Sequence, residues 1–267
     1  MKISFFNKKL LLKVKSITSP FFAISTVFMS FVDLTQKDRL ILLGILVVLS
    51  VGIYLFELYK NNNLSSKKVV VNGTKIEIKF GDIFKEKGQK LIAFNEFFDT
   101  QVDDKIISSG SLNGKFIKKY CNYDKKTLDE MISHSDSLKK IDVNNRIHGG
   151  KSVRYALGSL CKIDDYFIMA FSHFDAKNRA YLSVSDYIIC LLSMWNELDC
   201  YYDGEKIILP LLGSGITRFN DAEISDQELL NYILFTLQVS RINFKSGIKI
   251  VIGEDLKKGI NLFEIGE

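Results

Sequence analysis

A short glycine-containing loop near the C-terminal end carries the residues best suited to bind an anion. The apolar run Ile207–Leu212 is typical of a buried strand, and it leads into Gly213-Ser214-Gly215 and then Arg218. Glycine lets the backbone approach a ligand closely, and successive N–H groups in such a turn can donate to phosphate oxygens. The guanidinium of Arg218 would strengthen that site. The same residues also fit an ordinary tight turn, so their interpretation depends on the surrounding elements.

Two other polar loops directly follow predicted strands. Gly81-Asp82-Ile83 follows Lys75–Phe80, and Asn95 follows the apolar run Leu91–Phe94. In parallel sheets covered by helices, ligands bind at the carboxyl ends of the strands, near helix N-termini. These loops therefore supply candidate ligand contacts. For the aspartate the alternative, an N-cap of a short helix over 83–87, stays open.

The elements between these loops predict an α/β domain. Asn72-Gly73 between two short runs of β-forming residues is typical of a type I′ hairpin turn. Strands that alternate with helices of about 12–16 residues imply a largely parallel sheet covered on both faces. The expected strands are 69–71, 75–80, 90–94, 162–163, 165–171, 206–212 and 249–252, and the expected helices are 124–137, 183–196 and 226–240.

In this order the three loops resemble the signature of the macro domain, a fold that binds ADP-ribose and related nucleotides. The stretches FNEFFDTQVDDKIISSGSLNGKFIKKY and LPLLGSGITRF look most like the membrane-anchored macro-domain effectors of Thoeris antiphage systems. The resemblance covers roughly residues 69–255. It implies a macro-like, three-layer α/β/α domain with a mixed, largely parallel sheet.

The resemblance implies a role for each matching position. The Asp82 carboxylate would accept a hydrogen bond from the adenine amino group, and Asn95 would lie near the distal ribose. Backbone N–H groups of Gly213–Ile216 would donate to the diphosphate. The expected ligand-binding residues are Asp82, Ile83, Asn95, Gly114, Gly213, Ser214, Gly215, Ile216, Thr217, Arg218 and Phe219. For the last two, a solvated surface charge and a core aromatic stay open as alternatives.

One departure from the family pattern favours binding without turnover. Macro domains that hydrolyse ADP-ribose linkages usually carry a glycine run after the asparagine, whereas this chain has Glu96-Phe97-Phe98-Asp99. We therefore expect no enzyme activity and assign no catalytic residue. The three histidines, His134, His148 and His173, have no catalytic spacing.

Residues 1–60 contain two apolar runs. Ile17–Val32 lacks charged residues but includes Pro20, and Leu40–Phe56 would span about 26 Å as a helix, close to the hydrocarbon thickness of a bilayer. We expect a two-helix transmembrane hairpin over 1–60 with spans at about 17–34 and 40–57. A linker over 61–68 and the macro-like domain over 69–267 would follow. A single span, a signal peptide or a core helix are the alternatives, and the first run also suits a re-entrant or interfacial segment.

The distribution of charge orients this hairpin. Five lysines precede the first run and three follow the second, whereas the loop between the runs balances two positive charges with two aspartates. The positive-inside rule then places both termini and the macro-like domain in the cytoplasm of a bacterium, with a multi-pass hairpin in its inner membrane.

The remaining composition excludes several partners. Residues 1–60 hold eight basic and three acidic residues, whereas the rest of the chain holds 28 of each. A neutral domain argues against nucleic-acid binding. Cys121, Cys161, Cys190 and Cys200 lack metal-ligand spacing, so we expect reduced thiols, no metal site and no cofactor.

Together these features predict a signal-gated membrane effector of antiphage defence. The resemblance implies that a TIR-domain partner makes an ADP-ribose-derived nucleotide, of which histidine-conjugated ADP-ribose is one candidate. Binding of this second messenger would drive homo-oligomerisation, and the hairpin would then disrupt the lipid bilayer and stop growth. A membrane-tethered ADP-ribosyl hydrolase and a non-catalytic membrane scaffold are the alternatives.

Overall fold

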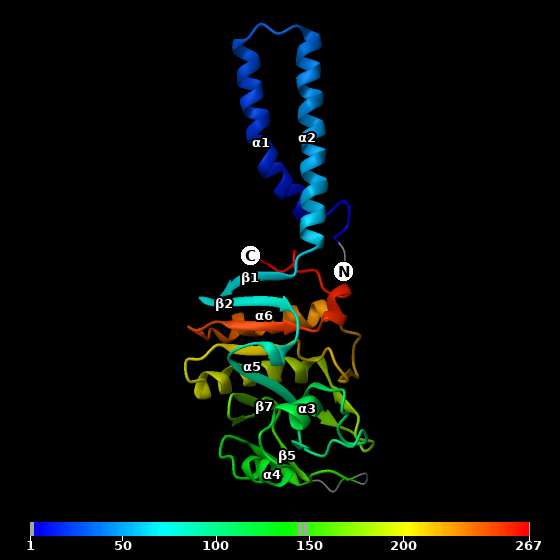
Figure 1. Cartoon of the computed structure of the whole chain (residues 1–267), viewed down its shortest axis with the longest axis vertical. Helices are drawn as coiled ribbons and strands as arrows, with labels where there is room; N and C mark the ends of the chain where they lie inside the picture. The colour runs from blue at the N-terminus through cyan, green and yellow to red at the C-terminus, as the bar shows by residue number, and fades with distance from the viewer. Residues whose placement is uncertain (1–2, 144–145, 147–148, 267) are drawn as a thin grey trace. The chain divides into compact units, whose positions relative to one another are not determined.

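The computed structural model describes residues 3–143, 146 and 149–266, and its elements are labelled in Figure 1. These residues divide into two compact units. One unit contains the described N-terminal residues up to Ser65 together with Asn261–Gly266, and the other contains Ser66–Ile260. This division differs from the predicted one. The second unit begins at Ser66, before residue 69, and Asn261–Gly266 group with the hairpin rather than with the domain predicted over 69–267.

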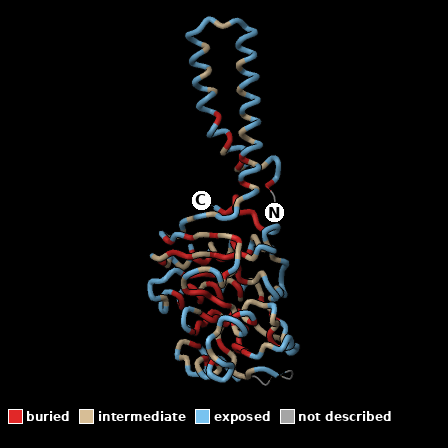
Figure 2. The backbone as a smooth tube through the Cα atoms, in the orientation of Figure 1, coloured by how far each residue is buried: buried red, intermediate tan, exposed pale blue. Residues whose placement is uncertain are grey.

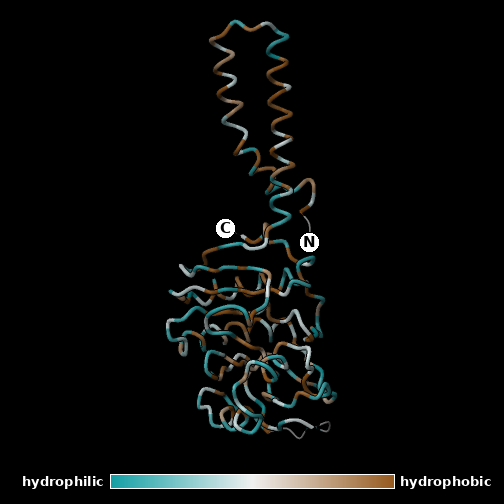
Figure 3. The backbone as a smooth tube through the Cα atoms, in the orientation of Figure 1, coloured by the Kyte–Doolittle hydropathy of each residue, from teal (hydrophilic) through white to brown (hydrophobic). Residues whose placement is uncertain are grey.

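The N-terminal unit is built on two long helices, α1 (Lys8–Phe31) and α2 (Gln36–Asn62). The side chains of Asn7 and Thr35 cap them by accepting backbone N–H groups of the first turn. Both helices are long and apolar enough to cross a membrane. Most of their large apolar side chains are exposed, as Figures 2 and 3 show by burial and hydropathy. Such a surface is unfavourable in water but suits lipid, so these helices do not fit the alternative of a buried core helix.

The helix ends differ from the predicted spans. Helix α1 begins at Lys8 instead of residue 17 and ends at Phe31 instead of 34. Helix α2 continues to Asn62, so the predicted linker over 61–68 shrinks to residues 63–65. The asparagines remain helical because their side chains are used inside the unit. Asn61 Nδ2 donates to the carbonyl oxygen of Glu57, and Asn62 Oδ1 accepts the Ile3 N–H at 2.7 Å.

The second unit contains one large mixed sheet. Its central strands, from β2 through β11, β9 and β3 to β7, all pair in parallel, whereas β1 and β6 pair antiparallel with β2 and β7. The largely parallel sheet predicted from the sequence is therefore confirmed. In spatial order the strands are β1 (Ser66–Val71), β2 (Thr74–Phe80), β11 (Ile248–Ile252), β9 (Ile207–Pro210), β3 (Gln89–Asn95), β7 (Tyr166–Phe174), β8 (Ala180–Leu182) and β10 (Arg218–Phe219), with β6 (Leu160–Ile163) beside β7.

Helices cover both faces of this sheet, which makes three layers. Ile92 and Phe94 of β3 pack against a cluster that includes Phe116 and Leu128, from η2 (Phe116–Tyr120) and α4 (Lys125–Ser133). On the other face lie α5 (Val184–Tyr201) and α6 (Asp226–Ser240), which contact each other through a 3.0 Å hydrogen bond from the Trp195 indole to Thr236. The three-layer α/β/α architecture is the one predicted.

Local signals predicted most elements but not all of them. Asn72 and Gly73 have φ values of 50° and 79°, as a type I′ turn requires, and α6 has the predicted bounds. Short pieces that carry little periodicity were not predicted. These are β8, β10, α3 (Leu112–Lys115), η3 (Glu254–Lys258) and the separate hairpin of β4 (Lys140–Val143) with β5 (Val153–Tyr155). The short helix η1 (Ile83–Lys85) lies within the helix over 83–87 that was left open as an alternative.

Candidate functional site

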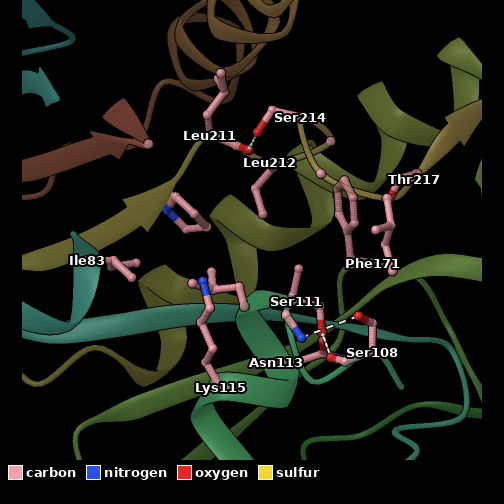
Figure 4. A pocket seen from close by; sticks show the side chains of 18 of the residues that line it. Ile83, Ser108, Ser111, Asn113, Lys115, Phe171, Leu211, Leu212, Ser214 and Thr217 are labelled. Atoms are coloured by element: carbon pink, nitrogen blue, oxygen red, sulfur yellow. Dashed lines mark hydrogen bonds between the residues drawn. The ribbon is translucent and has the colours of Figure 1, made fainter. Parts of the chain in front are cut away.

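A cavity of about 900 Å³ lies at the carboxyl ends of the parallel strands. The loops that follow β2, β3, β9 and β11 line it, and the segment from Ser108 to Lys115 closes the side opposite the loop after β9 (Figure 4). Parallel strands bring their carboxyl ends to one edge, so loops that are far apart in sequence meet there. Eight of the predicted ligand-binding residues line the cavity: Asp82, Ile83, Asn95, Gly213, Ser214, Gly215, Ile216 and Thr217.

The loop after β2 places an acid at the rim and an apolar side chain inside. Asp82 is exposed and is the N-cap of η1, since its Oδ1 accepts the Phe84 N–H at 3.0 Å. Ile83 is buried and points into the cavity (Figure 4). The N-cap alternative for Asp82 is thus realised, and it occupies one carboxylate oxygen. A second role in binding a donor such as an exocyclic amine is compatible with this geometry.

Asn95 ends β3 and is 2% exposed, but its side chain turns into its own loop. Its Oδ1 accepts the N–H groups of Phe97 at 3.0 Å and Asp99 at 3.3 Å, and its Nδ2 donates to Asp99 Oδ2 at 3.0 Å. Asp99 is in turn paired with Arg146 Nη1 at 2.5 Å. Asn95 therefore holds the loop as well as lining the cavity.

Phe97 and Phe98, which stand where the resemblance led us to expect glycines, are core residues. Phe98 is fully buried with φ 49°, a left-handed conformation that costs a residue with a side chain about 1–2 kcal/mol. Its ring packs edge-on against Tyr155 at 5.4 Å between centroids, and burial of an aromatic ring offsets such a cost. The loop after Asn95 thus keeps a glycine-like backbone turn but fills the space beneath it with side chains.

The loop after β9 offers unused backbone donors. Gly213 has φ 88°, and an added Cβ would lie 3.2 Å from Leu229. Ser214 donates both its N–H and its hydroxyl to the Leu211 carbonyl, at 3.4 and 2.7 Å. Among the described residues, no hydrogen bond uses the N–H groups of Gly215, Ile216 or Thr217. Three successive free N–H groups at a cavity wall can bind an anion.

Three predicted residues lie outside the cavity wall. Gly114 is buried in α3. A Cβ at this position would overlap the carbonyl oxygen of Ser108, so the glycine allows the two segments to pack closely. Arg218 and Phe219 form β10, which pairs with β8. Arg218 is exposed, and the Phe219 ring packs edge-on against Tyr187 at 5.5 Å. Arg218 is thus a surface charge and Phe219 a packed aromatic, which are the alternatives left open for them.

Sequence reasoning missed several parts of the wall, among them Lys115 and the loop after β11. Lys115 directs its side chain into the cavity from α3, and within the described chain it has no carboxylate partner (Figure 4). The loop after β11, Gly253–Leu256, lines the cavity from the far end of the sequence. Because a strand was predicted over 249–252, its carboxyl end could have been added to the candidate site.

The lining charges are partly neutralised. Glu86 accepts from Lys249 Nζ at 2.6 Å and from Lys79 Nζ at 2.9 Å. The hydrogen bonds from Lys249 and Lys79 hold the pKa of the Glu86 carboxyl below its usual range. Glu86 is therefore ionised near neutral pH and is a poor proton donor.

The parallel core, the helices on both faces and the cavity at the strand ends define a macro domain. The sequence matches the "Thoeris protein ThsA, Macro domain" family over residues 76–253. A relative, Thoeris protein ThsA of Bacillus amyloliquefaciens (strain Y2), is 42% identical over 247 residues, which cover 90% of this chain and 83% of the relative. The chain therefore belongs to the ThsA family of Thoeris proteins.

Solved structures of lower similarity are macrodomains too. A macrodomain of Oceanobacillus iheyensis with ADP is 16% identical, with a TM-score of 0.43, over 72% of this chain and 91% of that one. The same macrodomain with MES bound is 16% identical, with a TM-score of 0.43, over 72% of this chain and 92% of that one.

Proposed function

We propose that this protein is a membrane-anchored effector whose macro domain binds an ADP-ribose-derived signal nucleotide. A TIR-domain partner would supply this second messenger during phage infection. Histidine-conjugated ADP-ribose is one candidate for it. Binding would favour an oligomeric state in which the N-terminal hairpins disrupt the inner membrane and stop growth. The nucleotide acts as a ligand that is sensed, not as a cofactor.

One observation carries this proposal: a single cavity collects the loops after β2, β3 and β9 in a chain that also carries the apolar hairpin. The volume of about 900 Å³ is in the range of cavities that enclose small organic ligands. Free N–H groups at Gly215–Thr217 suit a diphosphate. At another wall, Asp82 and the buried Ile83 suit an adenine ring and its amino group.

The loop after Asn95 supports binding rather than turnover. The N–H groups of Phe97 and Asp99 donate to Asn95 Oδ1, so they do not face the cavity as free donors. The Asn95 amide also donates one N–H to Asp99. Glu86, a carboxylate at the wall, is bound by two lysines. These contacts give Asn95 and Glu86 structural partners, which favours binding of a nucleotide over its hydrolysis.

The hairpin supports a site of action in the membrane. The exposed apolar surfaces of α1 and α2 would be covered by lipid, and lysines at positions 8, 9, 13 and 15 and at 60 flank the apolar runs on one side. By the positive-inside rule that side is cytoplasmic. A ligand can drive the change only to the extent that it binds the disruptive state more tightly than the resting state.

Two measurements on the full chain test the proposal. In detergent, ADP-ribose, NAD, cyclic ADP-ribose and histidine-conjugated ADP-ribose are compared by thermal shift, and ligand at about 100 times its Kd should stabilise the fold by about 2.7 kcal/mol. In proteoliposomes loaded with a fluorescent dye, the same ligands should trigger leakage. A ligand that stabilises the protein at saturation but leaves the vesicles intact would overturn the effector role.

The same assays separate the alternatives. Release of free ADP-ribose from an ADP-ribosylated substrate, lost when Asn95 is changed to alanine, would favour a tethered hydrolase. Absence of stabilisation by every nucleotide tested would favour a membrane scaffold that uses the α/β domain for protein contacts.

A further inference from the structure

Residues 261–266 pack with the helices of the hairpin unit. The segment Asn261–Gly266, called the strap below, belongs to the same compact unit as α1 and α2. In sequence it follows η3, whose first residues line the nucleotide cavity. Residues 253–266 therefore include both part of the proposed ligand site and a segment that packs on the proposed membrane hairpin.

Polar contacts attach the strap to the start of α1. Lys9 Nζ donates to the Phe263 carbonyl oxygen at 3.1 Å, and Asn7 Nδ2 donates to Glu264 Oε1 at 2.6 Å. The ammonium groups of Lys9 and Lys13 lie 5.3 and 5.8 Å from the centre of the Phe263 ring, within the range of cation–π attraction. The strap thus holds two of the lysines that begin α1.

Apolar contacts attach the strap to both helices at once. Phe263 is 5% exposed and forms a cluster with Ile3 and Leu10, against which Tyr54 and Leu58 of α2 also pack. Burial of the Phe263 ring should stabilise this cluster more than the polar contacts of the strap do. Removing it would leave a cavity between the N-terminal turn, α1 and α2.

The strap contacts reinforce a direct bridge between the helices. Lys13 Nζ lies 2.7 Å from Glu57 Oε2, so the lysine that faces the Phe263 ring also joins α1 to α2. Pro20, which cannot donate a backbone hydrogen bond, lies farther along α1. The N-terminal part of α1 is therefore fixed by side-chain contacts. At Pro20 the helix lacks one backbone hydrogen bond and is weaker there.

The connection from the cavity wall to the strap is short. Leu256 lines the cavity, and the chain reaches Asn261 in five residue steps, which can span at most about 17 Å when extended. The connection is not extended, because the Gly259 N–H returns to the Leu256 carbonyl at 2.9 Å. A displacement of the wall that opens this turn fully would pull on the strap.

We propose that the strap is an autoinhibitory link that fixes the hairpin base until a nucleotide displaces the Gly253–Leu256 wall. This inference rests on the proposed function. Without ligand, Phe263 and its lysine contacts hold α1 against α2. With ligand bound, the Gly253–Leu256 wall moves and the strap leaves its contacts with α1. The N-terminal part of α1 then becomes free to rearrange in the membrane.

The first test asks whether breaking the strap activates the protein without any ligand. Full-length Phe263→Ala is reconstituted in dye-loaded liposomes made of phosphatidylethanolamine and phosphatidylglycerol. Leakage without nucleotide should rise about tenfold over wild type, since the link would be open in most molecules. Phe235→Ala, which removes an exposed phenylalanine of α6, is the matched control and should leak like wild type. Leakage from Phe263→Ala that equals the control overturns the autoinhibitory link.

A milder variant guards against misfolding. Lys9→Met keeps an apolar stem of similar length but removes the hydrogen bond to Phe263 and the cation–π contact. It should leak at a rate between wild type and Phe263→Ala, with an unchanged melting temperature for the cytoplasmic part. A Lys9→Met protein that leaks no more than wild type without nucleotide contradicts the proposal.

The second test follows the strap itself. The amide groups of Phe263 and Glu264 donate to Asn261 at 3.1 and 3.2 Å, so their hydrogen exchange reports on whether the strap is folded. Saturating ADP-ribose should speed this exchange about tenfold. If ADP-ribose raises the melting temperature but leaves strap exchange unchanged, the link fails and nucleotide binding stands. If neither ADP-ribose nor the other nucleotides bind, the proposed function fails, and the ligand-free leakage of Phe263→Ala still decides the autoinhibitory link.

Discussion

Asn95 and Asp99 are joined within one buried loop by a 3.0 Å hydrogen bond from the asparagine Nδ2 to the aspartate Oδ2. The aspartate also accepts the Lys151 N–H at 2.7 Å and pairs with Arg146. Asn95 is therefore the first member of a buried network that connects the loop 95–99 to Arg146 and Lys151. Removing the Asn95 side chain should therefore lower the stability of the fold, whatever its effect on ligand affinity.

Asn95→Ala should lower the free energy of unfolding by about 2 kcal/mol, because the N–H groups of Phe97 and Asp99 would be left without an acceptor. Thermal unfolding of the detergent-solubilised chain measures this. Ser172→Ala is a suitable control: Ser172 is a buried residue of the same cavity wall, and no hydrogen bond of its hydroxyl is described. Equal melting temperatures for the two variants would contradict the structural role of Asn95.

Two substitutions separate the capping role of Asp82 from a ligand role. Asp82→Asn keeps a good N-cap for η1 but replaces one acceptor oxygen by a donor, so stability should change little while affinity for ADP-ribose falls about tenfold. Asp82→Ala should lose the cap as well, at a cost of about 1 kcal/mol. Calorimetric titration with ADP-ribose, beside melting curves, distinguishes them. An Asp82→Asn protein that binds like wild type would restrict Asp82 to capping.

The glycines of the loop after β9 should respond in opposite ways to alanine. Gly213→Ala forces a left-handed φ on a residue with a Cβ and should cost about 1–2 kcal/mol of stability. At Gly215 the added Cβ would meet no atom within 4 Å, so the fold should tolerate it. If a diphosphate lies against this backbone, Gly215→Ala should nevertheless weaken ADP-ribose binding about tenfold. Unchanged affinity in this variant would place the ligand elsewhere.

The fold was predictable because its signals are local. Hydrophobic periodicity and caps predicted the bounds of α6, and Asn72-Gly73 predicted the turn between β1 and β2. The short strand β10 was not predictable in this way, because two residues carry no period and their pairing with β8 is set by tertiary contact. Docking of residues 261–266 onto the hairpin likewise depends on contacts far apart in sequence.

The site was predictable in part for a similar reason. Strand-end loops could be located from the sequence, and eight of the eleven expected residues line one cavity. Side-chain direction could not be predicted. Gly114 serves packing, Arg218 is exposed in an edge strand and does not line the cavity, and Lys115 supplies a cation that no pattern singled out.

Lys115 should contribute to binding of the charged part of the ligand. Lys115→Met removes the cation that enters the cavity and should weaken ADP-ribose binding about five- to tenfold, with a smaller salt dependence and no effect on adenosine. Lys119→Met, on the exposed residue one turn further, removes the same charge outside the cavity and serves as the control. Equal loss in both variants would indicate a general effect of net charge instead of a contact.

His173 should make the stability of the macro domain depend on pH. Its Nδ1 lies 2.7 Å from Glu96 Oε2, while Asp186 lies 3.9 Å from Nε2 and Arg154 approaches the same glutamate. The hydrogen bond to Glu96 raises the pKa of His173 above 6.5, although burial opposes this. The folded state therefore binds the proton more tightly than the unfolded state. The resulting stabilisation is complete below the unfolded pKa and is lost as pH rises through the folded pKa.

His173→Gln keeps a donor for Glu96 but cannot titrate, so its melting temperature should change less than that of wild type between pH 6 and pH 8. A difference of about 2–4 °C between the two proteins would correspond to about 1 kcal/mol in a domain of this size. Melting curves measured across that interval, with His134→Gln as an exposed-histidine control, provide the test. Parallel pH profiles for wild type and His173→Gln would show that the pair with Glu96 does not couple protonation to folding.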